Sequence, residues 1–174
     1  MNRFPLSVDL WGKRVYLIGN GEQIRKKAEK LAPFGPVLIR GDAFGEPEAE
    51  CAPALVIVGD TNRAEAERIA ALCQRHRIPV NVVDEPELCS FYFPALITRG
   101  DLTVSISTGG TSPAAAGCLR QKIEELLPEE TEQILGWLSE HRAALKERHL
   151  LKAAAAAAFS LGRPLTAEEL EKLE

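Results

Sequence analysis

Three stretches of the sequence combine residue types that could bind or transform a ligand. Gly19-Asn20-Gly21 directly follows an apolar run, and a glycine turn of this kind lets the backbone approach a phosphate closely. Asp84 follows another apolar run and supplies a carboxylate that could act as a general base. Glycines and hydroxyl side chains fill residues 107–112, directly before a predicted helix. These residue types suit a phosphate-bearing cofactor and proton transfer.

The elements around the glycine turn predict the start of a dinucleotide-binding unit. Val15 to Ile18 has the composition of a short buried strand, and a helix beginning near Glu22 follows at once. Its apolar residues recur at helical spacing, at Ile24, Ala28 and Leu31. Strand, glycine turn and helix place free helix N–H groups and a partial positive charge at a phosphate. The alternative is an ordinary strand-to-helix turn. Because the third position of the fingerprint is Ile24 instead of a small residue, helix and strand should sit slightly further apart.

The second predicted strand, Val37 to Ile39, leads to residues that could choose between nicotinamide cofactors. Asp42 would hold the ribose hydroxyls of NAD, whereas Arg40 would suit the 2′-phosphate of NADP. Both types occur together, so this region does not decide, and two solvated loop residues are the alternative.

Two further apolar runs, Ala54 to Val58 and Val80 to Val83, predict strands three and four of a parallel sheet. Asp60 and Thr61 follow the third strand, at the edge where such sheets bind ligands. Alternatively, Thr61 and Asn62 cap the next helix. For Asp84, at the end of the fourth strand, position alone favours an ordinary acidic surface turn over a general base.

After residue 94 the pattern changes to a hairpin and then to helices. Ala95 to Thr98 and Leu102 to Ser107 are predicted strands joined across Arg99-Gly100-Asp101. The loop before Pro113 either cradles an anion or caps the helix that begins there. The remaining helices carry few large apolar residues, so we expect them to pack on the hairpin or on a partner subunit and not to form a core of their own.

Composition excludes several classes of function. The formal net charge of the 174 residues is −4, which argues against nucleic acid as a partner. The apolar runs are shorter than the roughly 20 residues of a membrane helix, and the start of the chain does not resemble a signal peptide, so we expect a cytoplasmic protein without a membrane partner. The four cysteines are widely spaced and are expected to be free thiols, and no spacing predicts a metal site, so metal ligands stay unknown.

Three blocks of sequence, in this order, resemble a known family. The first runs from Phe4 to Val15 and continues at Gly19–Glu22. The second joins Ile78–Asp84 to Phe91–Ala95, and the third is Leu102–Pro113. Together they resemble the dehydrogenase domain of siroheme synthases and the stand-alone precorrin-2 dehydrogenases, over most of residues 4–127.

The resemblance implies an α/β fold. It would comprise a Rossmann-type parallel sheet domain at residues 1–94, a small strand-plus-helix dimerisation region at 95–127, and a C-terminal helical segment at 128–174. It also implies a homodimer.

The implied activity is the NAD-dependent oxidation of precorrin-2 to sirohydrochlorin, on the route to siroheme, and some members of the family also insert Fe²⁺. The family's key aspartate maps onto Asp84, as general base. The implied cofactor-binding residues are Gly19, Asn20, Gly21, Glu22, Asp42, Asp60 and Thr61. The implied contacts to the tetrapyrrole, whose carboxylates need cations, are Ser107, Thr108, Gly109, Gly110, Thr111, Ser112, Arg99 and Arg120.

The sequence departs from the family at the cofactor side. Relatives usually have three glycines where this chain has Gly19-Asn20-Gly21, and a small residue at Ile24. After the third strand they read Ala-Ala-Thr-Asp, where this chain has Val58-Gly59-Asp60-Thr61. An alternative is therefore a non-catalytic or chelatase-only member that binds a dinucleotide or a tetrapyrrole.

Overall fold

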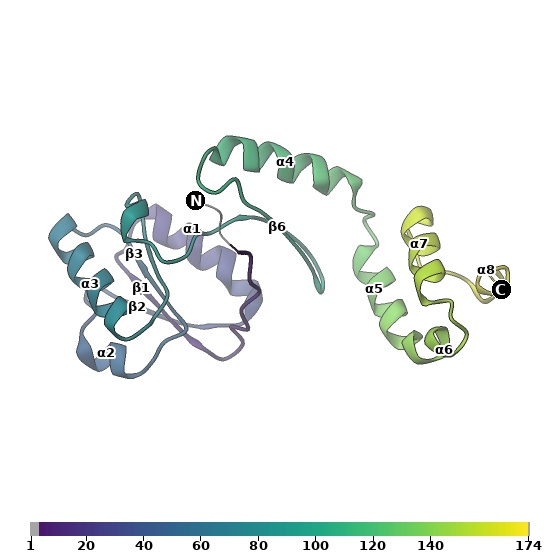
Figure 1. Ribbon diagram of the computed structural model, residues 1–174, viewed down its shortest axis with the longest axis horizontal. Helices are drawn as coiled ribbons and strands as arrows, with labels where there is room; N and C mark the ends of the chain where they lie inside the picture. The colour runs from purple at the N-terminus through teal and green to yellow at the C-terminus, as the bar shows by residue number, and fades with distance from the viewer. Residues whose placement is uncertain (1–3, 174) are drawn as a thin grey trace. The chain divides into compact units, whose positions relative to one another are not determined.

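The computed structural model describes residues 4–173, which form two compact units (Figure 1). The first unit is Phe4–Phe93, and the second begins at Pro94. Each unit is described by itself below.

The first unit is built on a parallel four-stranded sheet. Its strands are β1 (Arg14–Ile18), β2 (Val37–Gly41), β3 (Leu55–Val58) and β4 (Val80–Val82). Their order in the sheet is β2-β1-β3-β4, and every neighbouring pair is parallel. The chain leaves β1 toward β2 on one side and then crosses back to β3 on the other. The gap between the carboxyl ends of β1 and β3 is therefore the switch point at which such sheets bind ligands.

Two apolar cores lie on the two faces of this sheet. On one face α1 (Glu22–Leu31) buries Ile24, Ala28 and Leu31 against the sheet. On the other, α3 (Arg63–Arg75) packs with the short helix α2 (Glu46–Glu50). Two single 3₁₀ turns complete the unit, η1 (Ala32–Phe34) and η2 (Pro86–Leu88). The predicted Rossmann-type sheet is confirmed. The whole of β3 is buried, which explains its unbroken apolar run.

The second unit begins with the predicted hairpin. Strands β5 (Ala95–Arg99) and β6 (Leu102–Ile106) pair antiparallel across a two-residue turn. Gly100 in that turn has a φ of 55°, and a β-carbon there would lie 2.6 Å from Cγ of Glu132. Glycine is therefore required both by the backbone and by the neighbouring helix. Helix α4 (Pro113–Leu126) contacts both strands of the hairpin.

The last four helices contain a core of their own, so that part of the sequence prediction is wrong. They are α5 (Thr131–Glu140), α6 (Arg142–Glu147), α7 (Leu151–Leu161) and α8 (Ala167–Glu171). Ile134 and Leu145 are almost fully buried, and Ala154 and Ala158 let α7 approach its neighbours closely. The prediction counted large apolar residues, but this core is closed by alanines.

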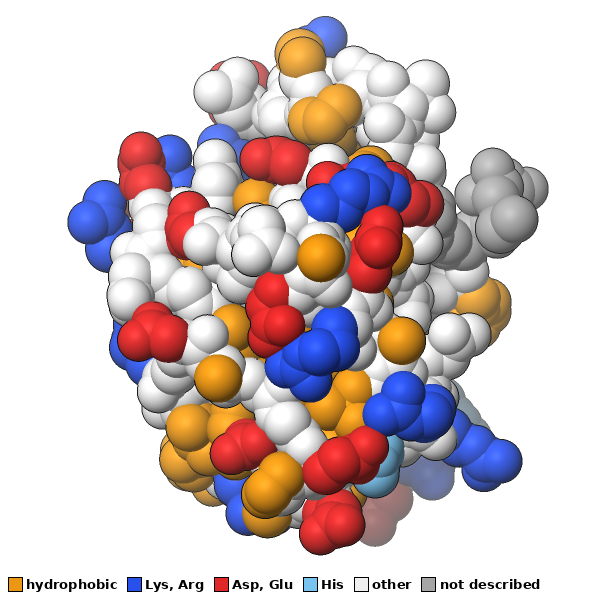
Figure 2. All heavy atoms as spheres, turned by 90° about the vertical axis from the view of Figure 1, so that its left-hand side faces the viewer, with side chains coloured by type: hydrophobic (Ala, Val, Ile, Leu, Met, Phe, Trp, Pro, Cys, Tyr) orange, Lys and Arg blue, Asp and Glu red, His pale blue; other side chains and the backbone are white. Residues whose placement is uncertain are grey.

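Each unit carries one tryptophan in a defined contact. Trp11 lies on Gly35, where a β-carbon would overlap its ring. Trp137 stacks on His141, with ring centroids 4.9 Å apart and an interplanar angle of 27°. Figure 2 shows acidic and basic side chains interspersed over the face it presents. Between residues 4 and 173, no helix is both long and apolar enough to span a bilayer.

Candidate functional site

The glycine turn lies at the switch point of the sheet. Gly19 has a φ of 100°, and its N–H donates to the carbonyl of Gly41 at 3.1 Å. A β-carbon on Gly19 would overlap the carbonyl oxygen of Gly59, at the end of β3. Glycine is thus required here by the backbone angle and by close approach of the neighbouring strand end.

The start of α1 is open to an anion. The first helical hydrogen bond is donated by Arg25 to the carbonyl of Gly21, at 3.1 Å. The amides of residues 22–24 donate no hydrogen bond within the described part of the chain. Such amides and the helix dipole attract phosphate groups, so the residues present fit the pyrophosphate of a dinucleotide.

One amide of the turn is already occupied by a carboxylate. The N–H of Gly21 donates to Oδ2 of Asp60 at 2.5 Å, and a β-carbon on Gly21 would overlap that carboxylate. Asp60 has a φ of 55°, a left-handed backbone that aspartate adopts more readily than most residues. The structure therefore places Asp60 on the amide that a phosphate would also seek.

Asn20 and Asp42 extend the site toward β2. Nδ2 of Asn20 donates to Oδ1 of Asp42 at 3.0 Å, which joins the middle of the glycine turn to the residue after β2. Arg40 is exposed on β2. Glu22 forms an ion pair with Lys26 at 2.6 Å, and the hydrogen bond from Lys26 lowers the pKa of Glu22.

Gly59 explains how the chain tolerates Ile24 where a small residue was expected. A β-carbon on Gly59 would lie 3.0 Å from both Cγ1 and Cδ1 of Ile24, and 3.2 Å from Cγ2 of Val83. The isoleucine side chain therefore fills the space that Gly59 leaves empty. Room for Ile24 is provided by the end of β3.

Asp84 stands at the end of the neighbouring strand. The N–H of Val83 donates to the carbonyl of Val58 at 2.8 Å, so the chain leading to Asp84 continues the ladder beside β3. Asp84 itself is exposed and has a φ of 61°. Its carboxylate and that of Asp60 thus follow adjacent strands at the same edge of the sheet.

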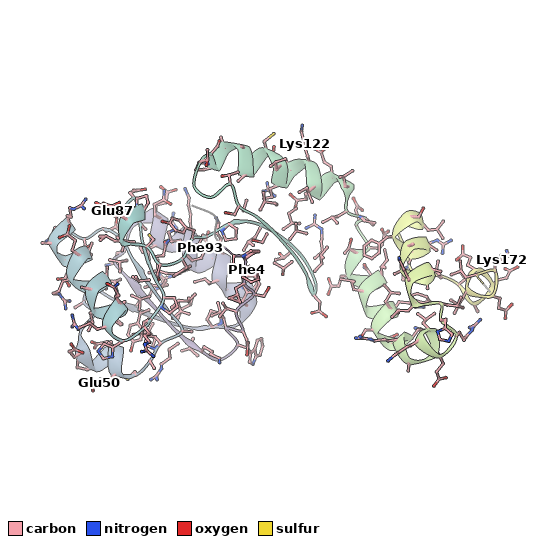
Figure 3. All side chains as sticks on the ribbon, in the orientation of Figure 1. Phe4, Glu50, Glu87, Phe93, Lys122 and Lys172 are labelled. Atoms are coloured by element: carbon pink, nitrogen blue, oxygen red, sulfur yellow. The ribbon has the colours of Figure 1, made fainter. Side chains whose placement is uncertain are left out.

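Arg63 fixes the segment that follows Asp84. From the start of α3 its guanidinium bonds to Glu67 at 2.8 Å, Glu85 at 2.9 Å and Glu87 at 3.0 Å. These contacts, led by the bond to Glu67, raise the pKa of Arg63, while the nearby Glu87 raises that of Glu85. Glu87 is the middle residue of η2 and is labelled in Figure 3. We call the ion pairs of Arg63 with Glu85 and Glu87 the clamp. It joins the start of α3 to the segment that follows Asp84.

A half-buried lysine on α1 also faces this region, and sequence reasoning missed it. Nζ of Lys27 lies 4.6 Å from the centre of the Phe93 ring. Burial lowers the pKa of Lys27, with Lys30 adding to the effect and the charges of Cys89 and Asp84 opposing it. Lys27 could have been suspected because it stands three residues after Ile24, beside the buried face of the helix. Nothing in the sequence points to the role of Arg63, because Glu85 and Glu87, the two partners that it holds beside Asp84, lie 22 and 24 residues away.

Asn62, two residues after Asp60, caps the next helix. Its side chain accepts from the N–H of Glu65 at 2.9 Å and so caps α3, as the alternative interpretation predicted. Thr61 is partly exposed between Asp60 and this cap.

The hydroxyl-rich loop belongs to the second unit and is largely occupied with its own structure. Ser112 caps α4 by accepting from the N–H of Ala115 at 3.1 Å. The hydroxyl of Thr108 makes two hydrogen bonds with Ser112. It donates to the carbonyl of Ser112 at 3.0 Å and accepts from the N–H of Ser112 at 3.2 Å. Ser107 accepts from the N–H of Gly109 at 3.2 Å, and Gly110 has open space where a β-carbon would stand. Thr111 is exposed.

The two predicted cations of the second unit come together on one acid. Arg99 bonds to Glu124 at 3.2 Å, and Arg120 bonds to the other oxygen of the same carboxylate. Glu124 thus holds both guanidinium groups in place while neutralising one of their charges. Figure 3 shows Lys122 on the outer side of α4. Among residues 4–173, no three acidic, histidine or cysteine side chains cluster to hold a metal ion.

Two parts of the sequence match known protein families. Residues 6–95 match a family described as "Putative NAD(P)-binding", and residues 99–126 match one described as "Sirohaem biosynthesis protein central".

Similar proteins include "Siroheme synthase" from Azotobacter vinelandii, 33% identical over 166 residues. The alignment covers 84% of this chain and 36% of that protein. "Siroheme synthase" from Methylobacillus flagellatus is 32% identical over 169 residues, covering 85% of this chain and 36% of the relative. This chain therefore spans about a third of the length of these relatives. A solved structure, "SirC, precorrin-2 dehydrogenase", has a similar fold, with a TM-score of 0.67 and 17% identity, over 98% of this chain and 96% of that one.

Proposed function

The chain belongs to the putative NAD(P)-binding family, and its residues 99–126 match the central region of sirohaem biosynthesis proteins. We therefore propose that it oxidises precorrin-2 to sirohydrochlorin with NAD⁺. The observation that carries the proposal is the common edge of β1, β3 and β4. That edge carries the glycine turn after β1, where the amides of residues 22–24 have no partner among residues 4–173. On the far side of β3 it carries Asp84, two residues after the end of β4. A phosphate-binding turn and a carboxylate at one sheet edge are what hydride and proton removal from one substrate require.

Each residue has a defined task in this proposal. Gly19, Gly21 and the amides of residues 22–24 bind the pyrophosphate, and Asp42 holds the ribose. NAD⁺, when bound, supplies the hydride acceptor. Precorrin-2 loses one hydrogen as a hydride and the other as a proton. The carboxylate of Asp84 accepts this proton and passes it to water. Lys27, held over the Phe93 ring, places a positive charge within electrostatic reach of the Asp84 carboxylate.

Substrate recognition is assigned to the second unit. Precorrin-2 carries several carboxylates, which need cations and hydrogen-bond donors. Arg99 and Arg120 are held together by Glu124, so they present a fixed pair of guanidinium groups. The loop of residues 107–112 borders the tetrapyrrole in this proposal, with Thr111 and Gly110 as its open positions.

A second candidate function is favoured by Asp60. Its carboxylate accepts the N–H of Gly21, an amide that a dinucleotide would otherwise bind, so tight dinucleotide binding is disfavoured. A chain of this kind could keep Asp84 and the tetrapyrrole site but insert Fe²⁺, as substrate, into sirohydrochlorin, or bind a tetrapyrrole without turnover.

We also propose a homodimer in the cytoplasm. Large apolar side chains are exposed in both units, including Phe4 at 87%, Leu6 at 77% and Leu126 at 80%. Exposed apolar groups of this size are typical of surfaces that a partner covers. None of the four cysteines, all of which lie in the described part of the chain, forms a disulfide, which is typical of proteins from a reducing compartment.

The test is absorbance at the NADH band with precorrin-2 made in situ. Wild type should form sirohydrochlorin only with NAD⁺, and Asp84→Asn should abolish it. Asparagine tolerates the left-handed backbone at residue 84, so loss of activity reports the carboxylate and not a refolded turn. Asp9→Asn, which removes an exposed aspartate before β1, is the matched control.

The other outcomes separate the candidate functions. A wild type that is inactive with NAD⁺ but inserts Fe²⁺ into supplied sirohydrochlorin is a chelatase. A protein that does neither, yet binds sirohydrochlorin, is a non-catalytic member of the family. Either result contradicts the dehydrogenase.

A further inference from the structure

Asp60 stands where the cofactor's phosphate would bind, and this position has a consequence for affinity. Its Oδ2 accepts a hydrogen bond from the N–H of Gly21 at 2.5 Å. Gly21 precedes the first residue of α1, so the carboxylate lies at the positive end of the helix. The carboxylate of Asp60 thus already occupies the N-terminus of α1, which is the feature of the fold that would attract the pyrophosphate.

The local charges do not offset this carboxylate. Lys26, one of the cations in the first turns of α1, is paired with Glu22 at 2.6 Å. Nε of Arg25 lies 3.9 Å from Oε1 of Glu29. A second carboxylate, Asp42, is attached to the same turn through Asn20. An arriving pyrophosphate therefore meets two aspartates at the turn, while the nearest cations of α1 are engaged with glutamates.

Asp60 is free to leave. It is exposed, and within residues 4–173 its carboxylate makes no hydrogen bond besides the one from Gly21. A change of side-chain rotamer would release the amide without unfolding any element. Binding of phosphate and binding of the carboxylate are thus alternatives at one donor.

We propose that Asp60 is an internal competitor for the pyrophosphate subsite and sets the affinity of this chain for dinucleotides. The proposal rests on the proposed function in so far as it takes the glycine turn to be a dinucleotide site. The carboxylate occupies Gly21 in the free protein and must be displaced before the pyrophosphate binds. Its effect is specific to ligands with phosphate, because a nucleoside does not seek that amide.

The test compares ligands with and without phosphate by calorimetry on the full chain. The ligands are NAD⁺, ADP and adenosine. Asp60→Asn removes the charge but keeps the shape, and Asp60→Gly removes the side chain while tolerating the φ of 55°. Both variants should bind NAD⁺ and ADP about tenfold more tightly than wild type, with adenosine unchanged. Asp9→Asn should leave all three affinities unchanged.

A second measurement follows the amide itself. In wild type the ¹⁵N-resolved signal of the Gly21 N–H should show the strong hydrogen bond, and it should move on addition of NAD⁺. In Asp60→Gly the signal of the free protein should already have lost that bond. Persistence of the wild-type shift in this variant would contradict the assignment of the acceptor.

Each remaining outcome overturns the proposal in a distinct way. If wild type binds NAD⁺ and the Asp60 variants bind it no more tightly, Asp60 is not a competitor, although the NAD-dependent function stands. If adenosine gains as much as NAD⁺, the variants have opened the site generally, and charge competition is wrong. If neither wild type nor variant binds NAD⁺, both the competition and the NAD-dependent function fall.

Discussion

The side chain of Ile24 on α1 occupies the place that a side chain on Gly59, at the end of β3, would need. A β-carbon on Gly59 would lie 3.0 Å from two atoms of Ile24. The two departures from the family pattern at these positions thus compensate one another. A large residue on the helix is matched by a missing side chain on the strand.

Gly59→Ala should therefore destabilise the first unit by about 1–3 kcal/mol through overpacking. The cost should shrink when Ile24→Ala is added, giving a coupling free energy of about 1 kcal/mol in a double-mutant cycle. Urea unfolding of the four proteins measures it. Gly41→Ala is the control, because its β-carbon would meet the nearest atom at an ordinary 3.5 Å. Strict additivity of the two substitutions would show that the contact carries no energy.

Asp42 should set the choice between the two nicotinamide cofactors. Its carboxylate, joined to the turn by Asn20, would repel a 2′-phosphate, while Arg40 on the preceding strand β2 would attract one. Asp42→Asn should therefore shift the ratio of the NADP⁺ and NAD⁺ dissociation constants by about tenfold toward NADP⁺. Equilibrium binding of both dinucleotides measures this ratio. An unchanged ratio would place the 2′-hydroxyl away from β2.

Arg63 should act as a positioning residue for the turn of Asp84. Arg63→Gln loses the bonds to Glu85 and Glu87, so the amides of residues 85–89 should exchange hydrogen faster. The turnover number should fall by about three- to tenfold, with little change in KM for NAD⁺. Arg68→Gln is the matched control, because Arg68 lies on the same helix but pairs with Glu65. Equal exchange rates in both variants would contradict the clamp.

The acid end of the pH range should report the pairing of Arg163 with Glu169. The bond from Arg163 at 2.7 Å, assisted by the N–H of Thr166, lowers the pKa of Glu169 from 4.5 to about 2. The pKa of Glu169 is lower in the folded chain than in the unfolded chain. The ion pair therefore stabilises the fold at pH values above 4.5, and this stabilisation is lost as the pH falls through about 2. The carboxyl signal of Glu169 in an NMR titration gives the midpoint. Arg163→Gln should raise it, and a wild-type midpoint near 4.5 would refute the pairing.

The fold was predictable because its signals are local. The apolar run that became β3 is continuous since both faces of that strand are buried, and the glycine turn is visible in three residues. The hairpin follows from one Gly-Asp turn between two short runs. The tail was misjudged because its core is closed by Ala154 and Ala158, whose contribution depends on how near the helices approach and not on side-chain size.

The candidate site was predictable as a set of residues but not as a set of contacts. Asp60 was selected for its place at a strand end, yet its bond to Gly21 joins residues 39 positions apart. The compensation between Ile24 and Gly59 is likewise a meeting of a helix with a strand end. Arg63 and Lys27 act through partners from other elements, and no spacing in the sequence marks such pairs.

The placement of Trp11 and Trp137 gives the molecule two built-in optical reporters. The chain has two tryptophans, one in each unit. Trp11→Phe leaves emission from the second unit alone, where the Trp137 ring stacks on His141. Trp137→Phe leaves emission from the nucleotide-binding end alone. A pair of single-tryptophan proteins can therefore resolve whether the two units melt together or in sequence.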